Sequence, residues 1–164
     1  MENDKSGGIY MDKLGNINHI LDEFIWKDNI GLITKELGKS VGSQKIYVNL
    51  DSVPPKGYST KYHSHSQQEE FFYIISGIGT LQLNGQKIEV KSGDFLSKPA
   101  GRDIFHTFYN TGTEPLLILD IGTNEKEDTC YYPDEDVYLH KSNGVNHAIK
   151  GNTFLEDWSS DPNE

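Results

Sequence analysis

The chain has 164 residues, a length that suits one compact domain and argues against a second. Its formal net charge is -10, its pI is about 5.0 and it has no basic cluster, which argues against nucleic acid or an anionic membrane as a partner. No stretch approaches the ~20 apolar residues of a membrane span, and the polar N-terminus lacks the apolar core of a secretion signal. The single cysteine, Cys130, excludes an internal disulfide. We therefore expect a cytoplasmic protein in which Cys130 is a packed or surface thiol.

The N-terminal part of the chain has the weakest patterns. Residues 21–37 mix apolar and polar positions at irregular spacing, which is compatible with a short helix or an arm, and we assign residues 1–30 to an N-terminal arm. Regular alternation begins after Lys45, where Ile46, Val48 and Leu50 recur at every second position until Pro54 ends the run. This segment is predicted to be a strand.

The clearest local signal is a hairpin between Thr80 and Val90. Asn84 and Gly85 form a two-residue turn of the kind that favours positive φ angles. That turn fixes the register and places four apolar side chains on one face, those of Leu81, Leu83, Ile88 and Val90. The hairpin is therefore expected to have one buried face and one solvated face.

Two later runs, residues 71–75 and 116–121, are apolar on both faces. In a barrel with one interior, the outward side chains of such strands need a cover, which the N-terminal arm or a second subunit could supply. We predict a homodimer. After Asn124 the composition turns polar, so we place the barrel domain at residues 31–136 and a polar C-terminal tail at 137–164, with a disordered end.

The residues with most chemical content are His63, His65 and Glu70. Side chains two apart on a strand point the same way and lie roughly 6.6 Å apart, so the two histidines can approach one ion from the same face. Glu70 is out of phase with both, which requires a turn between the strands, and the polar residues 66–68 are the place for it. Glu69 is the alternative carboxylate.

His106 supplies a third imidazole, with Phe108 as an aromatic neighbour on the same face of its strand. Three imidazoles and one carboxylate suit one divalent transition metal ion (manganese, iron, nickel, cobalt or zinc), and an octahedral ion would keep two positions open. The predicted ligands are therefore His63, His65, Glu70 and His106. Three other histidines, His19, His140 and His147, are interpreted as surface or packing residues.

With these residues in place, the chain resembles the cupin superfamily. The first cupin motif runs glycine, five residues, His-x-His, three or four residues, glutamate, six residues, glycine, and every interval is met by Gly57, His63, His65, Glu70 and Gly77. The second runs glycine, five residues, Pro-x-Gly, two residues, histidine, three residues, asparagine. It is matched by Gly93, Pro99, Gly101, His106 and Asn110, except that four residues separate Gly101 from His106. The interval to Gly77 favours Glu70 over Glu69.

The resemblance implies an all-β fold, the double-stranded β-helix or jelly-roll barrel of a single-domain bacterial cupin, and a small-molecule ligand in the barrel. Our leading hypothesis is a metal-dependent enzyme that acts on a small oxygenated molecule such as a carboxylic acid or a sugar derivative. A sugar phosphate isomerase and a non-catalytic binding module are the alternatives, and no general acid or base is assigned. We expect the pocket to be formed by Phe72, Ile74 and Phe108, with Arg102, the only arginine, as a possible clamp for an anionic group.

Overall fold

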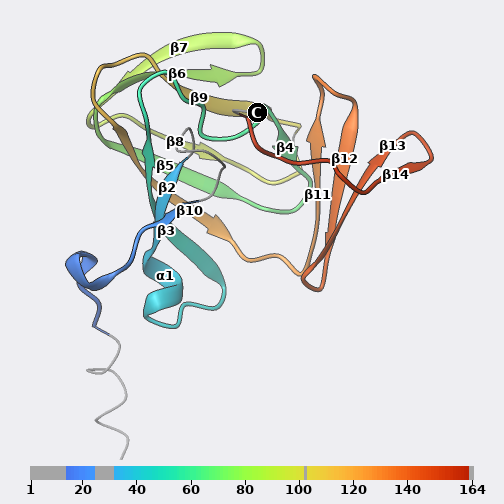
Figure 1. Ribbon diagram of the computed structural model, residues 1–164, viewed down its shortest axis with the longest axis horizontal. Helices are drawn as coiled ribbons and strands as arrows, with labels where there is room; N and C mark the ends of the chain where they lie inside the picture. The colour runs from blue at the N-terminus through green and yellow to red at the C-terminus, as the bar shows by residue number, and fades with distance from the viewer. Residues whose placement is uncertain (1–13, 25–31, 102, 163–164) are drawn as a thin grey trace, which may run out of the picture.

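A computed structural model describes residues 14–24, 32–101 and 103–162, and the described chain consists mostly of antiparallel β-strands (Figure 1). The largest sheet has the order β1-β2-β3-β10-β5-β8, with strands at Glu23–Phe24, Ile33–Glu36, Ile46–Val53, Leu116–Thr123, Glu70–Ser76 and Phe95–Lys98. The second has the order β14-β13-β12-β11-β4, at Thr153–Leu155, Val145–Lys150, Val137–Ser142, Glu127–Tyr132 and Ser64–His65. The third has the order β7-β6-β9, at Gln86–Lys91, Ile78–Leu83 and His106–Asn110.

Helical structure is limited, within the described residues, to a 3-10 turn at Ile17–His19 and the four-residue helix α1 at Leu37–Ser40. The described part of the chain has no helix of the length and apolar character needed to cross a membrane. The prediction of an all-β jelly roll is confirmed.

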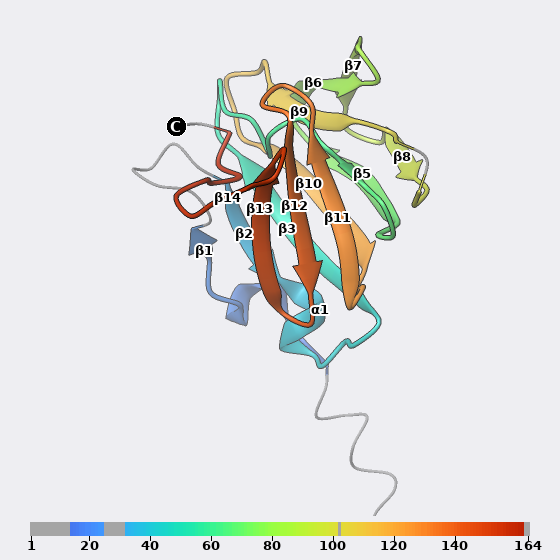
Figure 2. The same cartoon turned by 90° about the vertical axis from the view of Figure 1, so that its right-hand side faces the viewer.

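The sheets face one another in layers. Figure 2 shows the β11-β12-β13 layer in front of β3 and β10, with the β6-β7 hairpin at one end of the molecule. The main apolar core lies between the largest and the smallest sheet and contains Leu32, Val53, Phe72, Ile74, Leu81, Val90, Phe108, Leu116 and Ile118. Burial of these side chains from water, at about 25 cal/mol per Å² of apolar surface, is the main force that holds the two sheets together.

The predicted hairpin has the predicted register. Leu83 pairs with Gln86 and Leu81 with Ile88, around a turn in which Asn84 and Gly85 both have positive φ. Leu81 on β6 and Val90 on β7 are buried within the core, whereas Ile88, opposite Leu81, is 40% exposed. The alternation therefore predicted the buried face correctly, but not how far the core extends along it.

The chain turns between His65 and Glu70, as the phase of the side chains required. Strand β4 pairs with β11 in one sheet, and β5 pairs with β10 and β8 in another, so residues 66–69 carry the chain from sheet to sheet. Asp128 holds this turn, because its Oδ1 accepts hydrogen bonds from the backbone N–H groups of Ser66 (3.1 Å) and Gln67 (2.9 Å). A carboxylate from a distant strand thus fixes the geometry that brings His65 and Glu70 to one place.

The extra length before His106 is absorbed by a contact with the hairpin turn. Phe105 donates its backbone N–H to Asn84 Oδ1 at 2.8 Å, and Asn84 donates its own N–H to the Phe105 carbonyl at 3.0 Å. His106 then forms an antiparallel bridge with His63 through two backbone hydrogen bonds of 3.2 and 3.0 Å. The longer loop therefore leaves His106 beside His63.

The segment after residue 136 differs from the predicted polar tail. It forms β12, β13 and β14, which extend the sheet of β4 and β11, and turns at Asn143 and Gly144, both with positive φ. Val137 and Ala148 are buried against Cys130 in a second apolar cluster, which Leu139, Leu155 and Trp158 border. Each strand of this segment has an apolar face, but most of its residues are polar, so the average composition did not indicate strands. The domain boundary at 136 stays a prediction.

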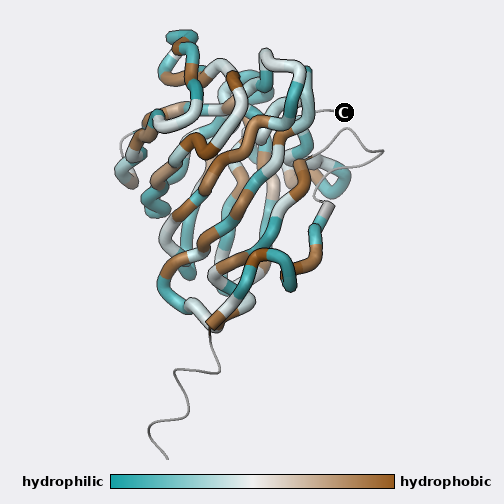
Figure 3. The backbone as a smooth tube through the Cα atoms, turned by 90° about the vertical axis from the view of Figure 1, so that its left-hand side faces the viewer, coloured by the Kyte–Doolittle hydropathy of each residue, from teal (hydrophilic) through white to brown (hydrophobic). Residues whose placement is uncertain are grey.

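The outer face of the largest sheet carries exposed apolar side chains. Phe71, Tyr73 and Ile75 on β5 are 37–40% exposed, and Phe95 on β8, which pairs with Tyr73, is 68% exposed. In the view of Figure 3, hydrophobic residues recur along neighbouring strands of the molecule. We call these four residues the outer apolar face. The part of the N-terminal arm that was expected to cover it, residues 1–13 and 25–30, lies outside the described residues.

Candidate metal centre

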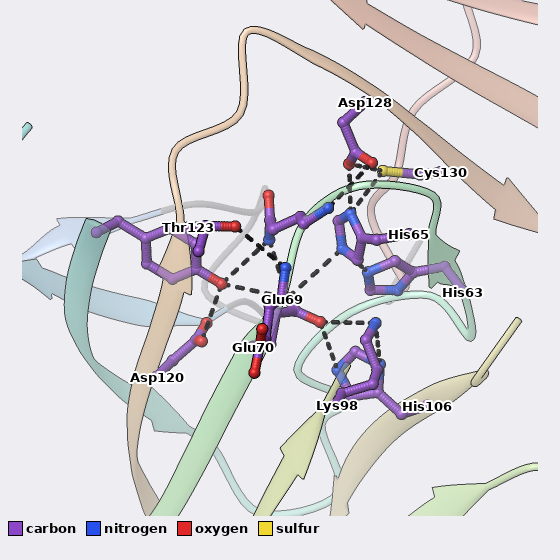
Figure 4. A network of polar contacts seen from close by, with 12 residues as sticks. His63, His65, Glu69, Glu70, Lys98, His106, Asp120, Thr123, Asp128 and Cys130 are labelled. Carbon is purple, nitrogen blue, oxygen red and sulfur yellow. Dashed lines mark hydrogen bonds and ion pairs between the residues drawn. The ribbon is translucent and has the colours of Figure 1, made fainter. Parts of the chain in front are cut away.

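Three of the four predicted ligands converge in the barrel interior (Figure 4). His63, His65 and Glu70 are all buried, and each offers a ligand atom that lies within 4.8 Å of the others. The Nε2 atoms of His63 and His65 are 3.0 Å apart, and His65 Nε2 is 3.5 Å from Glu70 Oε1. Glu69 is exposed on the opposite side of the strand, so the choice of Glu70 over Glu69 agrees with the geometry.

The hydrogen bonds of the two histidines determine where their protons lie. His63 Nδ1 is 2.7 Å from the Lys61 carbonyl and His65 Nδ1 is 2.6 Å from Asp128 Oδ2; in a neutral ring each of these nitrogens must be the donor. In a neutral ring the Nε2 atom then carries a lone pair, and the two Nε2 atoms face each other at 3.0 Å. Burial, with His106 and His65 nearby, holds the pKa of His63 well below its ordinary value, so this ring stays neutral.

This arrangement fits a bound cation. The Nε2 atoms of two imidazoles and a carboxylate oxygen face one small space, and a metal ion among them would bind all three as ligands. The donor types match those that manganese, iron, nickel, cobalt and zinc accept. His63, His65 and Glu70 are therefore the residues that would hold the ion.

His106 lies beside this group but has a different partner. Its ring centroid is 5.0 Å from that of His63, its Nδ1 is 3.1 Å from Lys98 Nζ, and its Nε2 is 3.9 Å from Glu70 Oε2. Burial and the charge of Lys98 lower the pKa of His106 to about 3, so it is neutral. His106 stays a predicted ligand, and its use would require the contact with Lys98 to change.

Glu70 is surrounded by polar partners. Lys98, itself only 1% exposed, places Nζ 2.6 Å from Glu70 Oε2, while Gln68 Nε2 donates to Glu70 Oε1 at 3.1 Å. Burial alone would raise the pKa of Glu70, but the neighbouring His106, His65 and Lys98 outweigh it and hold the pKa below its ordinary value. Glu70 is therefore ionised and available to a cation.

Asp128 and Cys130 lie on the other side of His65. His65, Asp128 and Cys130 form a second group of possible ligands, with Cys130 Sγ 3.3 Å from His65 Nδ1. Burial raises the pKa of Cys130 to about 11, which keeps it a thiol, and His65 Nδ1 already donates to Asp128. The first group is therefore better suited to a cation, and Asp128 acts by fixing the orientation and tautomer of His65.

A small cavity of about 60 Å³ lies against these residues, and we call it the inner cavity. His63, Glu70 and His106 line it together with Phe72 and Phe108. Ile74 is fully buried in the apolar core and is not among the described residues that line the cavity. Arg102, the predicted clamp, lies outside the described residues.

Two carboxyl groups line the same cavity on its far side. Asp51 on β3 accepts a hydrogen bond of 2.5 Å from Thr34 Oγ1, and Asp120 on β10 lines the cavity with it. Burial raises the pKa of Asp51 to about 6 and, with Asp51 alongside, raises that of Asp120 well above its ordinary value. We call Asp51 and Asp120 the carboxyl pair.

Tyr47 connects the carboxyl pair to the ligand group. Its hydroxyl lies 3.1 Å from Asp120 Oδ1 and 3.2 Å from Glu70 Oε1. Tyr47 pairs with Gly122 on β10, where a Cβ atom would lie 2.4 Å from the tyrosine ring. Glycine at this position therefore allows the ring to reach the site.

A larger outer pocket of about 500 Å³ adjoins the inner cavity, and Thr60 lines both. Its other walls include Tyr58, Tyr62, Gln82 and Tyr132. Tyr132 stacks on His63 with ring centroids 5.4 Å apart. The outer pocket is therefore the open space nearest to the candidate ligands.

Sequence reasoning missed five residues at the site: Tyr47, Asp51, Lys98, Asp120 and Asp128. Asp120 follows Leu116 and Ile118 on the inward face of its strand, and a carboxylate after two apolar inward positions is a usable signal for a buried polar site. The sequence gives no comparable sign for Asp128, which reaches His65 from 63 residues away. His140 and His147 are exposed and lie outside the group, as predicted.

Comparison of the chain with known protein families and structures agrees with this geometry. The family model described as a cupin domain matches residues 49–122, which include every predicted ligand. The chain contains a cupin domain. This cupin is 26% identical to a putative sugar phosphate isomerase from Acidithiobacillus ferrooxidans, whose crystal structure superimposes with a TM-score of 0.78 and covers 90% of this chain and 99% of that one.

Two curated relatives match shorter regions of the cupin. An uncharacterised protein of Methanocaldococcus jannaschii is 38% identical over 83 residues, 51% of this chain and 58% of the relative. The oxalate-binding protein of Thermotoga maritima is 33% identical over 67 residues, 41% of this chain and 54% of the relative. The chain thus spans little more than half the length of these relatives.

Proposed function

We propose that this cupin is a metal-dependent enzyme that acts on a small oxygenated molecule, a carboxylic acid or a sugar derivative, whose reacting group enters the inner cavity. The observation that carries the proposal is the pair of facing imidazole Nε2 atoms of His63 and His65, 3.0 Å apart, beside the ionised Glu70. When bound, a divalent ion would polarise a carbonyl or hydroxyl oxygen of the substrate. His63, His65 and Glu70 would hold it, with His106 as a fourth ligand.

Among the possible reactions, the carboxyl pair favours a proton transfer of the kind that sugar isomerases catalyse. Asp51 and Asp120 line the cavity together, and a carboxyl group whose pKa is raised by burial to about 6 can both donate and accept a proton near neutral pH. Phe72 and Phe108 keep water away from the same space, which strengthens electrostatic interactions there. The 26% identity to a putative sugar phosphate isomerase supports this reaction class.

A non-catalytic binding role is the second candidate, and the likeness to an oxalate-binding protein supports it. Lys98 offers a buried positive charge beside Glu70 that would contribute to holding an anion. Turnover separates the two roles. An isomerase converts an aldose into its ketose under anaerobic conditions, whereas a binding module returns every ligand unchanged.

The first test of the proposed function is elemental analysis of protein purified without added metal and then titrated with Mn²⁺, Fe²⁺, Ni²⁺, Co²⁺ and Zn²⁺. We expect close to one equivalent of one ion per chain, and below ~0.1 equivalent in a His63→Ala, His65→Ala double variant. The matched control is a His140→Ala, His147→Ala double variant, which should keep full occupancy. Binding of less than ~0.1 equivalent by the unsubstituted protein after titration would refute the metal site.

We also propose that the protein is a homodimer. The outer apolar face supports this, because its four large apolar side chains lie together on one sheet surface and remain 37–68% exposed in the described chain. Contiguous apolar patches of this kind on soluble proteins are typical of interfaces. A second subunit would remove these side chains from water.

A further inference from the structure

The inner cavity is too small for a whole sugar derivative. Its volume of about 60 Å³ has room for only a few heavy atoms, such as a carbonyl and its neighbouring hydroxyl group. The outer pocket, at about 500 Å³, is within the range of ordinary ligand sites. Thr60 lines both spaces, so a ligand whose reacting end lies in the inner cavity would place its remaining atoms in the outer pocket.

Much of the outer pocket comes from chain segments beyond the matched cupin domain. Tyr132, Asp134, Glu135, Asp161 and Pro162 all lie after residue 122. The C-terminal segment is attached to this wall through Trp158, which donates a hydrogen bond of 2.5 Å to Glu135 Oε2 and packs on Tyr132 at 4.7 Å between ring centroids. The outer pocket therefore depends in large part on residues outside the matched cupin domain.

The charges of the outer pocket are mainly negative. Among its described lining residues, Asp134, Glu135 and Asp161 are acidic and Lys61 is the only basic one. Lys61 and Glu135 offset each other, because Lys61 Nζ lies 2.6 Å from Glu135 Oε1, so the excess charge among the described lining residues is that of the two aspartates. With the formal net charge of -10 on the whole chain, the pocket repels anions.

The other lining groups suit hydrogen-bond donors with apolar flanks. Tyr58, Tyr62 and Tyr132 provide aromatic rings, and Gln82 and Thr107 provide neutral polar atoms. Carboxylates accept hydrogen bonds from hydroxyl and ammonium groups but repel the oxygens of a phosphate. These features together match a sugar or amino sugar without a phosphate group.

We propose that the outer pocket binds the non-reacting part of the substrate, that this part is a hydroxyl-rich group without negative charge, and that a phosphate ester is rejected there. The inference rests on the proposed function, because it assigns the substrate class of the same site. By this inference, the substrate of this chain differs from that of a sugar phosphate isomerase, although the reaction class is the same.

The experiment measures the charge preference of the outer pocket directly. A Gln82→Cys variant is treated separately with a positively charged and a negatively charged methanethiosulfonate reagent, and the ratio of the two modification rates is measured. The control is an Asn152→Cys variant, which places the thiol at an exposed turn that does not line the pocket. The rate ratios of the two variants are then compared. The unsubstituted protein gives the background from Cys130, which is fully buried. We expect a preference for the cation at least ~10 times larger in the Gln82→Cys variant than in the control variant.

Two further arms make the result decisive. Adding Asp134→Lys to the Gln82→Cys variant should reduce the preference for the cation, and 10-fold more inorganic phosphate than reagent should leave the rate of modification unchanged. Equal ratios at the two positions, or protection by phosphate, would overturn the inference. Metal content measured on the same samples tests the proposed function separately, because it does not depend on the charge of the outer pocket.

Discussion

Replacing Asp128 with asparagine tests how the metal centre is built, because Asp128 does not belong to the proposed ligand set. Its Oδ2 accepts the Nδ1 hydrogen of His65 at 2.6 Å in a buried position, and this bond leaves His65 Nε2 free to bind the ion. A hydrogen bond to a charged group contributes about 1.5–3 kcal/mol, and about 1.4 kcal/mol corresponds to a factor of ten in affinity. The Asp128→Asn variant should therefore bind metal about 10–100-fold more weakly.

The assay is a competition titration of Zn²⁺ between the protein and a chromophoric chelator, with circular dichroism to check that the variant is folded. Asp136→Asn is the matched control, because Asp136 is an exposed aspartate whose carboxylate accepts a hydrogen bond from Tyr131 in the same sheet. Asp128 also accepts backbone hydrogen bonds from residues 66 and 67, so the metal-free variant should unfold at a lower temperature. A folded Asp128→Asn variant whose affinity for Zn²⁺ is within a factor of two of the unsubstituted protein would refute this role.

Two further predictions concern stability and assembly. The folded-state pKa of Asp51, about 6, lies above the ordinary value of roughly 3.9, so the stability that its proton provides is complete below about pH 4 and is lost as the pH rises through about 6. The Asp51→Asn variant should lose up to roughly 3 kcal/mol of this pH dependence and should be more stable than the unsubstituted protein at pH 7. Urea unfolding at pH 4 and pH 7 measures both effects. If the difference in unfolding free energy between pH 4 and pH 7 is the same in the variant, Asp51 does not hold a proton in the folded protein. A Phe71→Lys, Phe95→Lys double variant should be monomeric by light scattering at ~10 µM where the unsubstituted protein is dimeric, and a monomeric unsubstituted protein would rule out the proposed dimer.

Local sequence was sufficient for the features that depend on neighbouring residues. The hairpin at residues 80–90 followed from Asn84 and Gly85, because a two-residue turn fixes the pairing on either side of it. The convergence of His63 and His65, and the turn before Glu70, followed from the two-residue period of a strand. The segment 137–155 was missed, because its strands are stabilised by packing on Cys130 and Tyr132 and not by an apolar composition of their own.

The sequence by itself therefore determined the cupin domain and the identity of the candidate ligands, since both depend on intervals along the chain. Tertiary structure decided how those ligands are held: Asp128 orients His65, Lys98 contacts Glu70 and His106, and Tyr47 reaches the site where Gly122 leaves space. It also decided that Asp51 and Asp120 line one cavity and that late segments of the chain form an acidic outer pocket. Such contacts join residues tens of positions apart, and their energies depend on burial and distance, which no local pattern specifies.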